Sequence, residues 1–232
     1  ITQLELLPTP KTRRPMPDAA YLFFTSGTTG KPKAVLGTHQ GLAHFLQWQQ
    51  ATFAIGPDDR CAQLTALSFD VVLRDIFTPL TSGATLCLPE ADASDPHQLL
   101  PWLQQEKITL LHTVPTLAEL WLTHRPEALT LPHLRLAFFA GEPLPQALVQ
   151  RWQQHLAPHG QIINLYGPTE TTLAKCYYPV PTPPPPGVQP VGRPMPHAQA
   201  LLLNSNDQLC GIGEVGEIVL RTPFRSLGYL NI

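Results

Sequence analysis

A short loop near the start of the chain combines hydroxyl, glycine and lysine residues in the order Thr25-Ser26-Gly27-Thr28-Thr29-Gly30-Lys31-Pro32-Lys33-Ala34. Glycine lets a backbone turn tightly and approach a ligand closely, and successive exposed N–H groups form a concavity that binds anions. The hydroxyls add donors and the lysines add positive charge, which suits the phosphates of a nucleotide. The loop is not a Walker A motif, because Thr25 replaces its first glycine and Pro32 replaces its magnesium-binding hydroxyl residue.

A second cluster reads Asn164-Leu165-Tyr166-Gly167-Pro168-Thr169-Glu170 and follows the apolar run 161–163. Gly-Pro marks a turn at the end of the expected strand. A planar base can stack on Tyr166, and a carboxylate such as Glu170 beside phosphates can hold magnesium, which takes few protein ligands. Taken alone, this cluster is more simply explained as a structural turn. For the first loop, the alternative interpretation is a flexible surface loop that binds no ligand.

Composition excludes several classes of function. The chain has 232 residues, a formal net charge of −2 and a pI near 6.5, so it lacks the charge that nucleic acids or anionic membranes attract. No apolar run approaches the ~18 residues of a membrane helix. The four cysteines have no Cys-x-x-Cys spacing and fit the reduced thiols of a cytoplasmic protein. Because the chain starts at Ile1, we expect it to be part of a longer protein.

The sequence argues against three other kinds of functional site. Pro158 separates His155 from His159, so these histidines do not form a helical zinc motif. There is no Gly-x-Ser-x-Gly element of a serine hydrolase. Residues 211–216 match the dinucleotide pattern Gly-x-Gly-x-x-Gly, but a turn cluster precedes them and a β-like run follows. We therefore predict a loop between strands there.

Strands and helices alternate along most of the chain. The pattern predicts helices between the strands, including one over 145–156 and one introduced by Asp95-Pro96. This alternation predicts an α/β fold with a mostly parallel sheet covered by helices. Ligands of such folds gather at the carboxyl ends of the strands, where both clusters would lie and form one nucleotide site. The expected strands are 20–24, 61–66, 84–88, 108–113, 134–139 and 161–165.

The chain changes character near its C-terminal end. Residues 179–190 are proline-rich, with four consecutive prolines at 183–186, and predict an extended connector; a partner-docking motif is the alternative. Beyond them, 198–203 and 217–221 predict strands of a smaller β-rich subdomain. The predicted division is 1–178 for the α/β part, 179–190 for the connector and 191–232 for the start of the subdomain.

Together the two clusters resemble the motifs of adenylate-forming (AMP-binding) enzymes, and more narrowly the adenylation domain of a nonribosomal peptide synthetase. Phe69-Asp70 ahead of Asp75-Ile76-Phe77 is similar to a third family motif, and 216–220 through 228–230 to a fourth. The resemblance covers essentially the whole chain. It implies a fragment of the large N-terminal domain, without the C-terminal lid domain, so the isolated fragment can be inactive.

The resemblance implies an ATP site. Tyr166 would stack on adenine, Thr169 would contact the α-phosphate and Glu170 would bind Mg2+. No protein nucleophile is needed, because positioning and electrostatic stabilisation carry the catalysis. The implied catalytic residues are Thr25, Lys31, Thr169 and Glu170. The implied nucleotide-binding residues are Thr25, Ser26, Gly27, Thr28, Thr29, Gly30, Lys31, Gly141, Glu142, Asn164, Tyr166, Gly167 and Thr169.

Asp70 narrows the implied substrate class. In similar domains the aspartate of the Phe-Asp pair meets the α-ammonium of an amino acid, and a buried carboxylate needs such a partner. The alternative is that Asp70 caps a helix near Val71. Arg74 and His112 suggest a polar group on the substrate, unless Arg74 points outward and His112 is a satisfied core histidine. The resemblance surrounds the substrate side chain with Val71, Arg74, His112, Phe138, Ala140, Leu165, Leu173 and Ala174.

The implied reaction converts an amino acid and ATP into an aminoacyl adenylate and pyrophosphate. The acyl group then passes to the phosphopantetheine thiol of a peptidyl carrier protein that works with a condensation domain. Two alternatives stay open: an acyl- or aryl-CoA ligase, for which Asp70 would have no use, and a catalytically silent scaffold. The chain departs from the family pattern at Ala34, at Val72 and at Ser226-Leu227, where Ala-Arg is usual.

Overall fold

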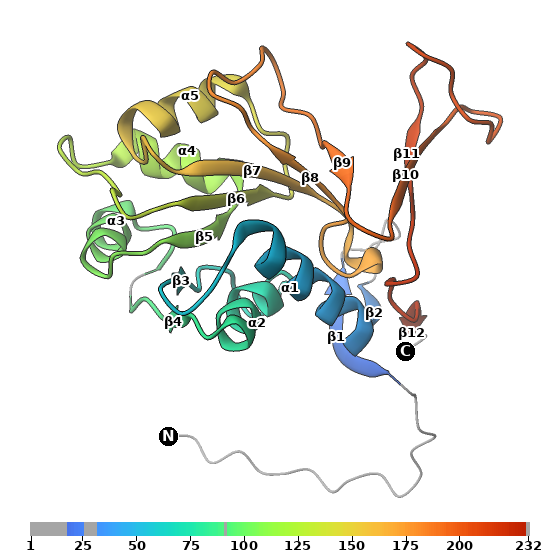
Figure 1. Cartoon of the computed structure of the whole chain (residues 1–232), viewed down its shortest axis with the longest axis horizontal. Helices are drawn as coiled ribbons and strands as arrows, with labels where there is room; N and C mark the ends of the chain where they lie inside the picture. Colours follow the sequence, from blue (N-terminus) through green and yellow to red (C-terminus); the bar gives the residue numbers. More distant parts are fainter. Residues whose placement is uncertain (1–17, 26–31, 91, 231–232) are drawn as a thin grey trace, which may run out of the picture.

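The computed structural model describes residues 18–25, 32–90 and 92–230, and its centre is a seven-stranded sheet in the order β4-β3-β5-β6-β7-β8-β9 (Figure 1). The strands β4, β3, β5, β6 and β7 run parallel, whereas β8 and β9 are antiparallel to their neighbours. The predicted α/β fold with a mostly parallel sheet is confirmed. The strands are β3 (Arg60–Ala62), β4 (Thr85–Cys87), β5 (Leu110–Thr113), β6 (Leu136–Ala140), β7 (Gln161–Tyr166), β8 (Cys176–Pro179) and β9 (Arg193–Pro194).

Helices cover both faces of this sheet and form two cores. On one face, α3 (Pro96–Gln105), α4 (Pro115–His124) and α5 (Gln146–His155) pack with residues such as Trp121 and Trp152. On the other, α1 (His39–Phe53) contributes Phe45 and Phe53, and α2 (Val72–Ser82) packs against α1. The sheet is therefore buried on both faces, as parallel sheets usually are.

Local sequence explains the start of α3 and the buried face of α5. The Asp95 carboxylate accepts a hydrogen bond from the His97 N–H at 3.0 Å, and Pro96 occupies the first turn of α3, where its missing N–H is not needed. In α5, Leu148, Val149 and Trp152 turn one face into the core. Both predicted helices are confirmed.

The first strand lies in a different sheet from the one predicted. Strand β1 (Ala19–Thr25) pairs antiparallel with β2 (Lys33–Thr38), which also pairs with β12 (Tyr229–Leu230). A short connection joins neighbouring strands only in the antiparallel sense, because parallel strands need a long crossover. β1 alternates between half-buried and exposed residues, with Phe24 56% exposed. The apolar run 21–24 indicates a buried strand of the parallel sheet, and this prediction is wrong.

The C-terminal part contains the hairpin of β10 (Gln199–Leu203) and β11 (Glu217–Arg221), as predicted, with residues 211–216 in its connecting loop. The proline-rich segment joins β8 to β9, which pair with each other. It also packs on the sheet domain, since the Gln189 N–H donates to the Leu144 carbonyl and the Gln146 N–H to that of Gly187. The segment is therefore a fixed part of the domain surface, whereas the division into 1–178, 179–190 and 191–232 stays a prediction.

The four cysteines are free thiols, and Cys61, Cys87 and Cys176 are buried. Among the described residues, none of the helices is long and apolar enough to traverse a lipid bilayer.

Candidate functional site

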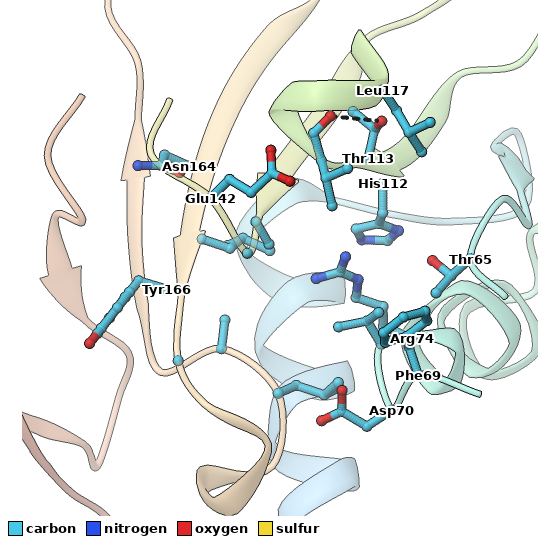
Figure 2. A pocket seen from close by; sticks show the side chains of 18 of the residues that line it. Thr65, Phe69, Asp70, Arg74, His112, Thr113, Leu117, Glu142, Asn164 and Tyr166 are labelled. Atoms are coloured by element: carbon cyan, nitrogen blue, oxygen red, sulfur yellow. Dashed lines mark hydrogen bonds between the residues drawn. The ribbon is translucent and has the colours of Figure 1, made fainter. Parts of the chain in front are cut away.

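A cavity of about 970 Å³ opens beyond the carboxyl ends of β3, β5, β6 and β7. Figure 2 shows Asp70, Arg74 and His112 on one side of it, with Asn164 and Tyr166 on the opposite side. Parallel strands end at this edge of the sheet, which is where open α/β folds bind ligands. Most of the predicted site residues line the cavity: Asp70, Val71, Arg74, His112, Ala140, Gly141, Glu142, Asn164, Leu165, Tyr166, Gly167, Thr169, Leu173 and Ala174.

Other predicted residues lie elsewhere. Ser26, Gly27, Thr28, Thr29, Gly30 and Lys31 fall outside the described residues. Thr25 ends β1, pairs with Lys33 across the hairpin and is not among the residues that line the cavity. The expectation that both clusters end strands of the parallel sheet is thus correct only for the second cluster, which includes the last residues of β7.

The backbone after β7 is packed too closely for a side chain at Gly167. A Cβ atom there would lie 2.7 Å from the Leu173 carbonyl oxygen and 2.7 Å from the Lys175 nitrogen. The turn carries Tyr166 and Thr169 to the cavity and leads into the short 3-10 helix η1 (Thr169–Thr171), which contacts β2. Gly167 is therefore a structural residue of the predicted nucleotide side.

Two residues on this side are held by hydrogen bonds to neighbouring loops. The Glu142 carboxylate accepts from the Thr116 N–H at 2.9 Å and from its hydroxyl at 2.6 Å, so it anchors the first turn of α4. The Asn164 amide donates to the Pro190 carbonyl at 2.9 Å. The proline-rich segment thereby becomes one wall of the cavity, with Val188 and Gln189 also lining it.

Glu170, the predicted magnesium ligand, lies just beyond the residues that line the cavity. Its carboxylate accepts a hydrogen bond from the Tyr229 hydroxyl at 2.5 Å, which raises the pKa of Tyr229. Within the described ranges, no group of three or more histidine, cysteine or acidic side chains is arranged to hold a metal. A single carboxylate nevertheless fits magnesium bound with a nucleotide, because that ion takes most of its ligands from phosphates and water.

Asp70 is a buried carboxylate at the floor of the cavity, 8% exposed. The N-cap of α2 is Val71, and no side chain closes that end of the helix, so the capping explanation of Asp70 fails. Burial raises the pKa of Asp70, although a hydrogen bond with the Thr169 side chain, the charge of Arg74 and a hydrogen bond with the Val71 N–H oppose the rise. Such a group gains most from a cation in the cavity.

Arg74 and His112 both turn inward, with exposed fractions of 3% and 1%. The Gln49 amide accepts from the Thr78 hydroxyl and, through its nitrogen, contacts His112 Nε2 at 2.8 Å. That contact makes Nε2 the acceptor and leaves the proton on Nδ1, 3.0 Å from Asp75 Oδ1. Burial and the nearby Arg74 lower the pKa of His112 to about 4, so the imidazole is neutral.

Phe138 does not line the cavity, unlike the rest of the predicted substrate-side residues. It is fully buried and stacks behind His112, with ring centroids 4.9 Å apart. Any effect of Phe138 on a ligand therefore passes through the position of the imidazole.

Sequence reasoning missed the residues that hold this side of the cavity together. Gln49 and Asp75 position His112, and Thr65 donates its N–H to Asp75 at 3.2 Å. Lys175 is fully buried behind the wall and donates to the Thr172 carbonyl at 2.6 Å, and burial lowers its pKa to about 7. For Lys175, the only signal in the sequence was a charged residue within an apolar stretch.

The chain resembles known proteins over almost its full length. The model of the family described as AMP-binding enzyme matches residues 3–230. L-2-aminoadipate reductase of Schizosaccharomyces pombe is 39% identical over 90% of this chain, and delta-poly-L-ornithine synthetase of Acinetobacter baumannii is 38% identical over 91%. The chain spans about 15% of the length of each of these two relatives.

A solved structure shares the fold. The nonribosomal peptide synthetase FmoA3 (S1046A), crystallised with alpha-methyl-L-serine-AMP, superposes with a TM-score of 0.83 at 30% identity. The match covers 92% of this chain and 24% of that chain.

Proposed function

Since the chain belongs to the AMP-binding enzyme family, we propose that the protein carrying it activates an amino acid with ATP. The amino-acid carboxylate attacks the α-phosphate, an O–P bond forms to give the aminoacyl adenylate, and the bond to pyrophosphate breaks. The names of both relatives contain an amino acid, and the neighbouring structure holds an aminoacyl adenylate, which supports this class of substrate.

The buried carboxylate of Asp70 is the observation that carries the proposal. It faces the cavity, does not cap α2 and has a raised pKa because of its burial. The α-ammonium of an amino acid would pair with it and favour its ionised form. A carboxylic acid without the amino group would leave this charge buried and uncompensated, at a cost in affinity.

The nucleotide would occupy the other side of the cavity. The Tyr166 ring offers a stacking surface for adenine, and Thr169 would bring its hydroxyl to the α-phosphate. The glycine- and lysine-containing loop of residues 25–33 would hold the departing pyrophosphate. Mg2+ bound with ATP at Glu170 would neutralise phosphate charge. The residues thus act by orientation and charge stabilisation.

The proposal extends to the fate of the adenylate. The acyl group would be transferred to the phosphopantetheine thiol of a peptidyl carrier protein, with release of AMP, and then used by a condensation domain of the same assembly in the cytoplasm. The likeness to a nonribosomal peptide synthetase supports this second step.

The first step is tested by amino-acid-dependent exchange of pyrophosphate into ATP, measured with the complete protein that carries this chain. The panel pairs each common amino acid with the acid that lacks its α-amino group. We expect exchange with one or a few amino acids and at least tenfold less with the matched deaminated acids, because only the amino acids supply a cation to Asp70.

Preference for the deaminated acids would overturn the proposal in favour of an acyl ligase. Loading of the carrier protein, followed by mass spectrometry of the phosphopantetheine arm, tests the second step. A protein that exchanges pyrophosphate but leaves the carrier unloaded would contradict the proposed transfer.

A further inference from the structure

We infer that the activated amino acid has a side chain ending in a carboxylate, and that the guanidinium of Arg74 recognises it. This inference rests on the proposed amino-acid activation and names the substrate class within it. Arg74 lies in the first turn of α2, and its side chain reaches into the cavity below His112 (Figure 2). The side chain is 3% exposed, so its charge is removed from bulk water.

The guanidinium lacks a well-placed anion. Its Nε is 3.8 Å from Asp75 Oδ1, which exceeds hydrogen-bond length, and this Nε has no hydrogen-bond partner within the described ranges. Burial lowers the pKa of Arg74, although the charges of Asp75 and Asp70 oppose this shift. A guanidinium presents five N–H donors in one plane, and burying it without partners is costly.

The carboxylate of Asp75 lies close to both His112 and Arg74. It accepts the Thr65 N–H at 3.2 Å through Oδ2, and its Oδ1 is 3.0 Å from His112 Nδ1. The ring of His112 is in turn held by Gln49. Asp75 Oδ1 makes no hydrogen bond to either His112 Nδ1 or Arg74 Nε within the described ranges, so Asp75 contributes nearby charge without occupying the guanidinium of Arg74.

The remaining groups around Arg74 exclude other side chains. Neutral His112 adds no charge, and the neighbouring lining residues are apolar or carry a hydroxyl: Val71, Ala140, Leu165, Leu173, Ala174, Thr65 and Thr113. A cationic side chain would meet Arg74 in an enclosed space, and an aliphatic one would leave its donors unpaired. A carboxylate accepts two parallel hydrogen bonds from a guanidinium, which is the strongest available match.

The positions of Asp70 and Arg74 also fit a dicarboxylic amino acid. The two residues are four apart in sequence and line the same side of the cavity (Figure 2). A substrate would place its α-ammonium on Asp70 and its terminal carboxylate on Arg74, with the methylene groups against the apolar lining residues. Opposite charges at the two ends thereby fix the orientation of the substrate.

The test uses the complete protein and pyrophosphate exchange with L-aspartate, L-glutamate and the next longer dicarboxylic homologue, each beside its side-chain amide. L-leucine and L-lysine represent aliphatic and cationic side chains. We expect one acid to exceed its own amide at least tenfold in kcat/KM. Preference for an amide, an aliphatic or a cationic amino acid would overturn the inference while leaving the proposed function intact. Exchange with none of this panel but with another common amino acid would likewise overturn the inference alone, whereas exchange with none of the common amino acids would overturn the proposed function.

Variants separate recognition from folding. Arg74→Gln should lower kcat/KM for the acid at least tenfold, mainly through KM, and change that for the amide little; Arg74→Lys should restore part of the loss. Arg151→Gln, at an exposed ion pair with Glu119, is the matched control and should leave the preference unchanged. ATP binding by each variant checks its folding. An equal loss for acid and amide in both Arg74 variants would contradict the recognition role.

Discussion

Asp70 is a single carboxylate whose surroundings leave it in need of a cation. It is buried beside Thr169 and faces the cavity, and the helix that follows it uses Val71 as N-cap. Arg74, on the same side of the cavity, is a buried cation. Two buried charges of opposite sign therefore face the same cavity. We expect these two residues to decide which substrate binds.

Replacing Asp70 by Asn should abolish most amino-acid-dependent pyrophosphate exchange. The amide cannot balance an α-ammonium, and the loss of a buried charge-assisted contact typically costs about 2–5 kcal/mol, which corresponds to a fall of about 30-fold or more in kcat/KM. ATP binding, measured by titration calorimetry, should persist because Asp70 is not expected to touch the nucleotide. Undiminished exchange in Asp70→Asn would rule out the ammonium contact.

Lys175 makes stability depend on pH. Its pKa falls to about 7 on burial, from an ordinary value of 10.5. As pH drops from the ordinary value toward 7, the unfolded chain takes up a proton that the folded chain does not, so stability decreases; below 7 both states are protonated and the penalty is constant. The wild-type protein should therefore gain stability between about pH 7 and about pH 10 from this residue.

In Lys175→Met this gain should vanish, because the side chain no longer titrates. The difference in unfolding free energy between variant and wild type, from denaturant titrations, should favour the variant more at about pH 7 than at about pH 10. The exposed Lys107 supplies the control Lys107→Met, for which the difference should stay constant. A constant difference for Lys175→Met as well would mean that its amine is not perturbed.

At the scale of elements, sequence patterns predicted what is local. The helices at 96–105 and 146–155 and the strand at 161–166 follow from capping residues and apolar patterns. Strand β2 was hidden, because its start coincides with the end of the lysine-containing loop. Because β2 is the pairing partner of β1, overlooking β2 also led to the wrong sheet for β1.

The cap of α3 should be worth about 1 kcal/mol. In Asp95→Ala the His97 N–H loses its acceptor, Asp95 Oδ1, and the side-chain amide of Gln98 loses its acceptor, Asp95 Oδ2. Hydrogen exchange of the first amides of α3 should quicken about fivefold, as that free energy implies. Asp58→Ala, an exposed position, is the control and should leave these rates unchanged. Equal rates in Asp95→Ala and wild type would show that Pro96 alone sets the start of the helix.

Across the whole molecule, the site depends on contacts between residues far apart in sequence. Gln49, Asp75 and His112 come from α1, α2 and β5, and the proline-rich segment returns to Asn164 of β7. The motifs and the family resemblance they carry identified about half of the residues that line the cavity. They could not identify the residues that orient them, since such pairs exist only after the chain has packed.

The core between the sheet and α3, α4 and α5 should dominate global stability. Trp152 is fully buried there, with its ring centroid 5.2 Å from that of Phe139 and 6.2 Å from that of Trp121. Trp152→Ala should lower the free energy of unfolding by about 3–5 kcal/mol, measured by denaturant titration of the complete protein. Leu202→Ala, 47% exposed on β10, should change it by less than about 0.5 kcal/mol. Similar losses in both variants would place the main core elsewhere.

The spacing of Asp70 and Arg74 has a consequence for divergence after gene duplication. In the proposed roles, Asp70 ahead of α2 would bind the shared α-ammonium, and Arg74 within the first turn of α2 would bind the variable end of the substrate. Because separate positions carry these two tasks, a descendant copy can exchange residue 74 and acquire a new monomer while residue 70 keeps the reaction. A substitution at residue 74 could thus change which amino acid is activated while the adenylation reaction stays the same.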